Sequence, residues 1–495
     1  MGNTESCKII RPRIDRACDI GKCTKSIKGY TSNSASPTDI WELKMYDDVR
    51  YGQEKIPNTL ILKLYIDISS EILKVDKLES KDREELRYES DIYNYVIGLF
   101  TRENINPYFV RYYGASQNCT FNQLVDSVTE GKSMVLGEMT KLGISKPQFI
   151  ENLLRNTVYM AFNLRDRPSI TDNTISKKQI VDVLKDDIVK NDEVKYGMII
   201  TEKSNGKTFD EWINRQIVDS KITDDGWKSI VQVVSALTAL ETLEVAHNDL
   251  HYGNIFVEEL DGEILEQFKY TYNDKELGFG IRSNFRCAIY DWDRGYMKKL
   301  GPNYYLDDNE LCKSYSQCNE YVPQREVTKF LIYLLQDPKL HPDEKQKIYE
   351  CMMVGDTDKI DYFEDRVVDH SDMGIFLYFD SFTKDRTMTR KDFEELGIFT
   401  PSKVLTKLLF LLKRQGISTN GIHSKSIIEF ISTNDSDYFD ENSVIYDMRK
   451  DVVQEKFSNY YNKKDFKQME IFEDDTLINY FNDNTMKRKF DDVFS

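Results

Sequence analysis

The sequence predicts an α+β protein with two lobes, a small β-rich lobe followed by a larger helical lobe. Three observations predict this architecture. The run Thr59–Ile66 is apolar and β-prone, and apolar residues recur at helical spacing from Asp224 to Val245. Two short apolar runs, 255–257 and 288–290, suit strands. With 495 residues, 40% of them hydrophobic, the chain is long enough for both lobes and for additional helices.

The strand expected at residues 59–66 contains one cation, Lys63. A charge inside an apolar strand is costly unless it is paired or faces a ligand. Glu89 lies on an expected amphipathic helix and is the partner predicted for Lys63, with Glu84 and Glu85 as alternatives about one turn earlier. The simpler explanation is an edge-strand lysine that points to water.

Two polar loops, about forty residues apart, contain the candidate catalytic residues. The first follows the helix expected at 224–245, which Asp224 or Asp225 is expected to cap, and has the pattern His-x-Asp-Leu-x-x-x-Asn. The second follows an apolar strand. Together they supply a carboxylate and metal-binding oxygens, which phosphoryl transfer from ATP requires. Each residue alone is more often a turn former, but the joint pattern in this context favours catalysis.

These motifs resemble the protein kinase-like superfamily, and most closely the serine/threonine kinases of large DNA viruses, such as those of iridoviruses. The resemblance covers about residues 20–335 and includes a segment at 106–114 and a strand with a following hinge at 196–206. It implies a bilobal kinase fold, ATP and Mg²⁺ as cofactors, and transfer of the γ-phosphate to hydroxyl groups of viral structural or host proteins. The residues that carry it are Lys63, Glu89, His247, Asp249, Asn254 and Asp291.

Carried onto this chain, the resemblance implies that Asp249 accepts or orients the proton of the acceptor hydroxyl. It implies that Lys63 holds the ATP phosphates and that Glu89 pairs with Lys63, which makes these three the catalytic set. The residues implied to bind ATP and metal are Gly29 near the phosphates, Lys63, Thr201 and Glu202 at the adenine edge, and Asn254, Asp291 and Asp293 at the metal.

The sequence also departs from the kinase pattern. His251 stands where serine/threonine kinases usually carry a lysine, and Asp-Leu-His-x-Gly-Asn is similar to aminoglycoside and choline phosphotransferases, as is the second acid Asp293. A full Gly-x-Gly-x-x-Gly is absent, and Gly29 opens the best substitute, a run of small residues at 29–36. Asn248 replaces the arginine before the catalytic aspartate. A small-molecule phosphotransferase is one alternative function, and a pseudokinase or structural virion protein is another.

The expected domain organisation follows from these motifs. The stretch at 120–195 is too long for a simple connection and is expected to be an inserted subdomain. A helix that begins near Arg325 and Glu326 is expected at the centre of the larger lobe. The predicted parts are an acylated, disordered segment (1–20), the small lobe with its insertion (21–205), the core of the larger lobe (206–340) and a helical carboxy-terminal extension (341–495).

The first six residues, Met-Gly-Asn-Thr-Glu-Ser, match the N-myristoylation pattern, with Gly2 as the acceptor. One acyl chain gives only marginal membrane binding, and Cys7 is a possible second attachment point. The expected location is therefore the virion and the host cytoplasm, with membrane association through this acyl group. An unmodified, disordered start is the alternative.

Charge and cysteine content bound the remaining possibilities. A net charge of −17 disfavours a general nucleic-acid binder and suits basic protein substrates. The eight cysteines are scattered, and neither Cys18/Cys23 nor Cys312/Cys318 has a second ligand pair nearby. Free thiols in a reducing compartment are therefore expected, without zinc or disulfides. The sequence shows no secretory signal and no apolar run long enough to span a bilayer.

Overall fold

The described residues form two compact units. The first unit comprises the described parts of Met1–Ser90 and Arg111–Lys203, and the second those of Asp91–Val110 and Ser204–Lys463. In this computed structural model the described residues are 24–29, 39–45, 50–51, 54–55, 57–67, 88–120, 195–303, 306, 311–312, 315–355, 357–371, 374–414 and 444–463.

Three regions with predicted roles lie outside the described residues. They are the acylation site at Gly2, the small residues that follow Gly29, and residues 121–194 of the expected insertion. Within the described part of the chain, no helix combines the length and the apolar character needed to cross a membrane.

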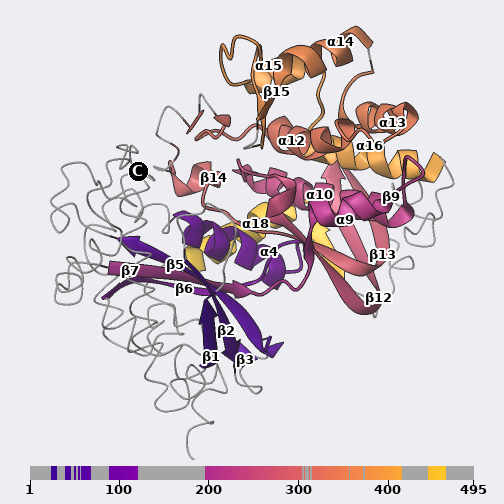
Figure 1. Ribbon diagram of the computed structural model, residues 1–495. Coiled ribbons are helices and arrows are strands. Elements are labelled where there is room, and N and C mark those ends of the chain that lie inside the picture. The colour runs from indigo at the N-terminus through magenta and orange to yellow at the C-terminus, as the bar shows by residue number, and fades with distance from the viewer. Residues whose placement is uncertain are drawn as a thin grey trace, which may run out of the picture. The chain divides into compact units, whose positions relative to one another are not determined.

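The first unit contains a five-stranded antiparallel sheet among its described residues, with the order β1-β2-β5-β7-β6 (Figure 1). The strands are β1 (Thr24–Gly29), β2 (Asp39–Met45), β5 (Thr59–Asp67), β6 (Tyr112–Thr120) and β7 (Lys195–Glu202), and a separate short pair is formed by β3 (Arg50–Tyr51) and β4 (Glu54–Lys55).

Alternation along β5 places Lys63. Leu60 and Leu62 are buried and pair with the buried residues Leu43 and Trp41 of β2. Successive side chains of a strand point to opposite faces of the sheet, so Lys63 projects from the face opposite to Leu62. The strand predicted at 59–66 is thus confirmed as β5, and its one cation lies off the apolar face.

The second unit is mixed in structure, with both helices and strands. Its helices are η3 (Tyr93–Ile97), α4 (Gly98–Arg102), α9 (Phe209–Gln216), α10 (Asp224–Leu243), η4 (Tyr252–Asn254), η5 (Lys298–Leu300), α12 (Pro323–Leu335), α13 (Pro342–Met352), α14 (Thr357–Tyr362), η7 (Phe363–Val367), α15 (Arg390–Glu395), α16 (Pro401–Arg414) and α18 (Lys450–Lys463). Its strands are β8 (Lys207–Thr208), β9 (Ile217–Val218), β10 (Lys221–Ile222), β11 (Val245–Ala246), β12 (Ile255–Tyr272), β13 (Lys275–Ile289), β14 (Tyr296–Met297), β15 (Val368–Ser371), β16 (Gly374–Leu377) and β17 (Ile445–Met448).

Helix α10 confirms the helix predicted from Asp224, and it packs against α16, β13 and α18. Its N-cap, however, is Thr223, whose Oγ1 accepts a hydrogen bond from the Gly226 amide at 3.2 Å. Asp224 and Asp225 instead occupy the first turn, where their charge favours the helix dipole. The helix ends at Leu243, and Glu244 adopts a left-handed conformation with φ of 55° that turns the chain into β11.

The two short strands predicted at 255–257 and 288–290 are the base of a much longer hairpin. Strands β12 and β13 pair from Ile255 opposite Ile289 to Tyr272 opposite Lys275, and Figure 1 shows them side by side. Asn273 and Asp274 form the turn with positive φ at both positions, which suits a two-residue hairpin loop.

The far end of this hairpin is covered by the carboxy-terminal region. That region was expected to be helical, but its strand β17 pairs in parallel with β12. Strands β15 and β16 also lie in this region, where they pair with each other in antiparallel orientation. The region is therefore mixed in structure among its described residues.

Strand β8 pairs with the beginning of β12, next to Asn254. Lys207 and Thr208 pair with Val257 and Phe256. Just before β8, Gly206 packs directly against the Val257 carbonyl group, and a Cβ atom there would overlap it. Only glycine fits this close approach of two backbones.

Candidate functional site

In the first unit, the structure brings Lys63 and Glu89 together. The Lys63 Nζ lies 3.2 Å from Glu89 Oε1 and 3.1 Å from Oε2. The Glu89 side chain is 1% exposed and the Lys63 side chain 14% exposed, so the pair is largely shielded from water. Glu89 lies in a helical segment, as expected, and the cation in the strand is thus paired.

The other predicted nucleotide-binding residues of this unit lie at strand ends. Gly29 ends β1 and pairs with Trp41. Thr201 lies between Ile61 on one side and Tyr112 on the other. The Glu202 side chain is buried, and its Oε1 accepts a hydrogen bond from the Arg111 amide at 2.8 Å. One carboxylate oxygen of Glu202 is therefore used inside the sheet.

In the second unit, the loop after β11 is fixed through Asn248. Its backbone has φ of 65°, a left-handed conformation that asparagine tolerates better than most residues. Its Nδ2 donates to the backbone oxygens of Arg294 at 2.9 Å and Cys318 at 3.1 Å. These bonds tie the loop to two later segments, which explains why asparagine stands before Asp249.

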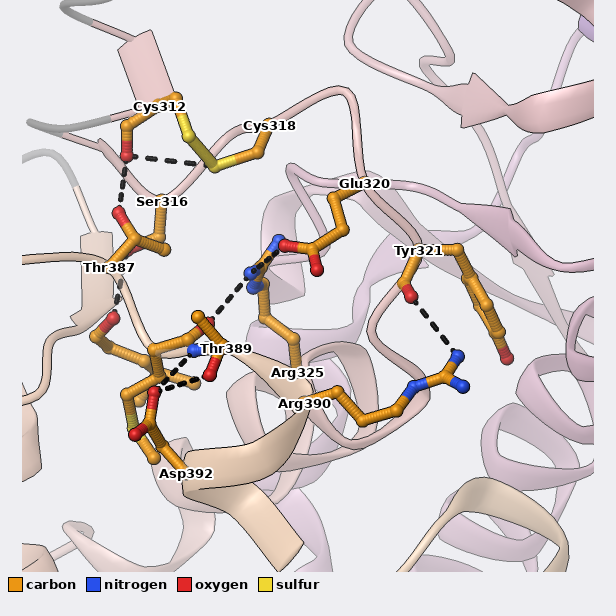
Figure 2. A network of polar contacts seen from close by, with 12 residues as sticks. Cys312, Ser316, Cys318, Glu320, Tyr321, Arg325, Thr387, Thr389, Arg390 and Asp392 are labelled. Atoms are coloured by element: carbon orange, nitrogen blue, oxygen red, sulfur yellow. Dashed lines mark hydrogen bonds and ion pairs between the residues drawn. A yellow bond between two sulfur atoms is a disulfide. The ribbon is translucent and has the colours of Figure 1, made fainter.

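Helix α12 also holds Asn248, through two of its side chains. The Asn248 amide donates to Glu326 Oε1 at 2.9 Å, and the Lys329 Nζ donates to the Asn248 carbonyl at 3.0 Å. Burial lowers the pKa of Lys329 to about 8, although Glu326 opposes the shift. Arg325, also buried, pairs with Glu320 at 3.6 Å and donates to the Met388 carbonyl at 2.9 Å (Figure 2).

The two histidines of the loop have structural partners. The His247 Nε2 lies 2.9 Å from the Tyr290 carbonyl, and its ring packs against Trp292 with ring centroids 4.5 Å apart. The His251 Nδ1 accepts a hydrogen bond from the Gly253 amide at 3.0 Å and so caps η4. Burial lowers the pKa of His251, which favours the neutral ring that this bond requires.

Asp249 is held by one carboxylate oxygen. Its Oδ1 accepts a hydrogen bond from Gln317 Nε2 at 3.0 Å and lies 3.6 Å from the Arg294 guanidinium. The side chain is 24% exposed. Among the described residues no hydrogen bond reaches Oδ2, so this oxygen is the one available to a hydroxyl group.

The predicted metal ligands Asn254 and Asp291 lie at the same end of the β12–β13 pair. Ile255 pairs with Ile289, and the Tyr290 amide donates to the Asn254 carbonyl at 3.1 Å. The Asn254 Nδ2 donates to the Asp249 carbonyl at 3.0 Å, so its amide oxygen is not used in this bond. Asp291 has φ of 68°, and its amide donates to the Tyr93 hydroxyl at 3.3 Å.

The side-chain oxygens of Asn254 and Asp291 fit Mg²⁺. In the described part of the chain, no group of three or more His, Cys, Asp or Glu side chains is placed to bind a metal. Mg²⁺ does not require such a group, since it is usually held by one or two carboxylates together with substrate phosphates and waters. An amide oxygen from Asn254 and a carboxylate from Asp291 are hard oxygen ligands of the required kind. Asp293 lies two residues further on, and its carbonyl accepts a hydrogen bond from Asn303 at 3.0 Å.

The expectation of free thiols without disulfides is wrong, because Cys312 and Cys318 are bonded to each other. Figure 2 shows this disulfide beside Ser316 and Thr387. The two cysteines are six residues apart in the chain, and their Cα atoms lie 4.5 Å apart. Cys287 and Cys351 are free and buried among the described residues.

Sequence analysis missed several residues that hold the loop, above all Gln317 and Lys329. Glu326 was noted only as part of a helix start. None of them belongs to a short motif, because they lie 68 to 81 residues from the loop atoms they contact. The one available signal was a set of charged residues inside an otherwise apolar helix, which implies buried partners.

Comparison with known proteins gives little further information. No protein-family model matches the chain, and no curated protein sequence matches it. Among solved structures, the chain is similar to the PF14_0431 kinase domain, with 12% sequence identity and a TM-score of 0.25. The match covers 55% of this chain and spans half of the length of that structure (50%). At these values the likeness establishes neither the fold nor the function.

Proposed function

We propose that the chain is an ATP- and Mg²⁺-dependent phosphotransferase, and specifically a serine/threonine protein kinase of bilobal, kinase-like fold. The observation that carries the proposal is the loop around Asp249. One carboxylate oxygen is held and the other left accessible, beside two oxygen ligands, Asn254 and Asp291, at the end of one strand pair. The paired Lys63 supports it, because a shielded cation suits the phosphates of ATP.

In the proposed reaction, the acceptor hydroxyl attacks the γ-phosphorus of ATP. The new bond joins the acceptor oxygen to phosphorus, the bond from phosphorus to the β,γ-bridging oxygen breaks, and ADP leaves. Asp249 Oδ2 accepts the hydroxyl proton. Asn254 and Asp291 would hold Mg²⁺, which when bound offsets negative charge on the phosphates. Lys63 would bind phosphate oxygens, and Glu89 keeps its ammonium group in place.

A protein acceptor is proposed on the sequence resemblance to serine/threonine kinases. The Nδ1 of His251 caps η4, whichever acceptor is used. The net charge of −17 suits a basic acceptor, either a polypeptide or a polycationic aminoglycoside, so the assay below is needed to separate the two. Virion association and host proteins as substrates remain part of the proposal on the sequence resemblance alone, as does myristoylation of Gly2, which labelled myristate and Gly2→Ala would test.

The deciding experiment incubates the purified chain with γ-labelled ATP and Mg²⁺. The acceptors are casein, a mixed lysate, aminoglycosides and amino alcohols, each tested separately. Label on protein serine and threonine supports the proposal, whereas label on small molecules alone supports the alternative acceptor. No transfer to any of them, with no Mg-ATP-dependent thermal shift, would indicate a pseudokinase or structural protein.

The matched variants are Asp291→Asn and Asp261→Asn. Asparagine tolerates the positive φ of Asp291, so the first variant removes the charge without straining the backbone. It is expected to lower turnover on the order of 10³-fold, since a metal contributes several kcal/mol to charge stabilisation. Asp261 is exposed on β12 and should leave turnover unchanged. Equal turnover in both variants contradicts the metal role.

A further inference from the structure

Gln317 is a buried amide that contacts the candidate catalytic carboxylate. Its side chain is 1% exposed, and its Nε2 donates to Asp249 Oδ1 at 3.0 Å. A carboxylate oxygen accepts a hydrogen bond from an N–H group, so the side-chain nitrogen of Gln317 must face Asp249. The Gln317 Oε1 is buried and makes no hydrogen bond to any described residue. The opposite orientation would set Oε1 against the carboxylate oxygen of Asp249 with no hydrogen between the two acceptors, so the contact with Asp249 fixes the orientation of the side-chain amide.

The segment that carries Gln317 is tied down on several sides. The backbone amide of Gln317 donates to the Leu311 carbonyl at 3.2 Å, and the Ser316 hydroxyl donates to the Leu377 carbonyl at 3.1 Å. The Cys318 carbonyl accepts a hydrogen bond from Asn248, the residue before Asp249.

The disulfide closes this segment at both ends. It joins Cys312 to Cys318, and the Cys312 carbonyl in turn accepts a hydrogen bond from the Thr387 hydroxyl at 2.5 Å (Figure 2). Ser316 has φ of 53°, so the chain turns sharply just before Gln317. A cross-link over so short a loop restricts the conformations open to the residues inside it.

We propose that Gln317 is a positioning residue for the phosphoryl transfer proposed above, and that the Cys312–Cys318 loop is what places it. The amide holds Asp249 Oδ1, so that Oδ2 is presented to the acceptor hydroxyl. The inference rests on the proposed function of Asp249. It differs from a packing role, because it requires a hydrogen-bond donor at position 317 and not merely a side chain of the right volume.

Three substitutions separate donor from volume. Gln317→Met keeps the approximate size and removes the donor, and it should lower kcat about tenfold, the effect of one lost hydrogen bond. Gln317→Glu keeps the shape but sets a carboxylate against Asp249, and it should lower kcat further, on the order of 10²-fold. Gln317→Lys restores a donor and should recover part of kcat. In all three, KM for ATP should stay within about twofold, because among the described residues no hydrogen bond joins Gln317 to a proposed nucleotide-binding side chain.

The matched control is Gln324→Met. Gln324 is also a buried glutamine, and its Oε1 likewise makes no hydrogen bond to described residues. Among the described residues no hydrogen bond joins Gln324 to the Asp249 loop, so kcat should be unchanged. A loss of kcat equal to that of Gln317→Met, or the order Met below Glu, would overturn the positioning role and indicate packing alone.

The disulfide is tested by Cys312→Ser with Cys318→Ser in one chain, alone and combined with Gln317→Met. If the loop acts through Gln317, the serine variant lowers kcat in the wild-type background and adds little in the Gln317→Met background. Full kcat in the serine variant, or fully additive losses, would overturn this link.

Different results would contradict the positioning role of Gln317 and the proposed phosphotransferase function. If the wild-type chain transfers phosphate and loses activity in Asp291→Asn, but Gln317→Met retains full kcat, only the present inference fails. If the wild-type chain shows no transfer, the proposed function fails first.

Discussion

The ion pair of the first unit and the Asp249 loop of the second are stabilised in different ways. Lys63 and Glu89 satisfy each other through two contacts between one strand and one helical segment. The loop instead depends on Asn248, whose amide, carbonyl and side chain are bound by groups 46 to 81 residues away. The ion pair can be disrupted only by substituting one of its two members. The conformation of the Asp249 loop can be disrupted by substituting residues far from it in the sequence, so these supporting residues are the better test of how the loop is held.

The largest effect should come from Asp249 itself. Asp249→Asn keeps the shape and an oxygen for Gln317, but loses the basic oxygen proposed to take the acceptor proton. We expect kcat to fall about 10²- to 10⁴-fold, as for loss of a general base. Steady-state phosphorylation measures this, and the Mg-ATP-dependent thermal shift should persist because Asp249 is not a proposed metal ligand. Undiminished turnover would point to a contaminating kinase.

The next largest effect should come from the buried support of the loop. Glu326→Met leaves the Asn248 amide without its acceptor and removes a carboxylate from beside Lys329 and Arg325. We expect the free energy of unfolding to fall by about 3 kcal/mol, together with activity. Chemical denaturation measures the first quantity. Glu263→Gln is the control, because Glu263 is exposed on β12 and should matter by less than about 1 kcal/mol.

A double-mutant cycle then probes the simpler pair. Lys63→Met and Glu89→Gln should each raise KM for ATP, and Lys63→Met should destabilise the protein by about 2 to 3 kcal/mol, since Glu89 loses its cation. The combined variant should be much less destabilised than the sum of the two. Additive effects would show that the contact contributes no coupling energy.

The smallest effect should come from a buried carboxyl group that has a phenol partner instead of a cation. Burial raises the pKa of Glu266 to about 7 from 4.5, although the hydrogen bond from Tyr108 opposes the shift. The folded protein holds this proton more tightly than the unfolded chain does. The free energy of unfolding attributable to Glu266 is therefore highest below about pH 4.5 and falls as pH rises through about 7.

Between pH 5 and pH 8 this fall should be on the order of 2 kcal/mol. Glu266→Gln should abolish that part of the pH dependence, as measured by denaturation at both pH values. Glu263→Gln, at an exposed position on the same strand, should leave it intact. An unchanged pH dependence in Glu266→Gln would show that other groups are responsible.

The sequence was most informative where local rules suffice. A lone cation in an apolar strand needs a partner, and an amphipathic helix has a recognisable period, so β5, α10 and the Lys63–Glu89 pair were predictable. The loops that end in Asn254 and Asp291 were predictable because polar motifs follow apolar runs. In each case the information lies within a few turns or one strand.

Other features depend on tertiary pairing and were missed. The middle of β12, residues 258–263, is mostly polar and gives no alternating pattern. It nevertheless belongs to one long strand, although the pairing with β13 shifts register between Glu259 and Ile264. The position of Gln317 depends on a loop closed by a disulfide, and spacing alone does not determine whether two cysteines join. The partners of Asn248 lie too far along the chain for any periodic signal.

The close contact at Gly206 couples the segment before α9 to strand β12, which follows Asn254. Any larger residue there would push on the Val257 carbonyl, three residues beyond that asparagine. A substitution at Gly206, a position with no reactive group, would therefore displace the backbone close to the proposed metal ligand Asn254.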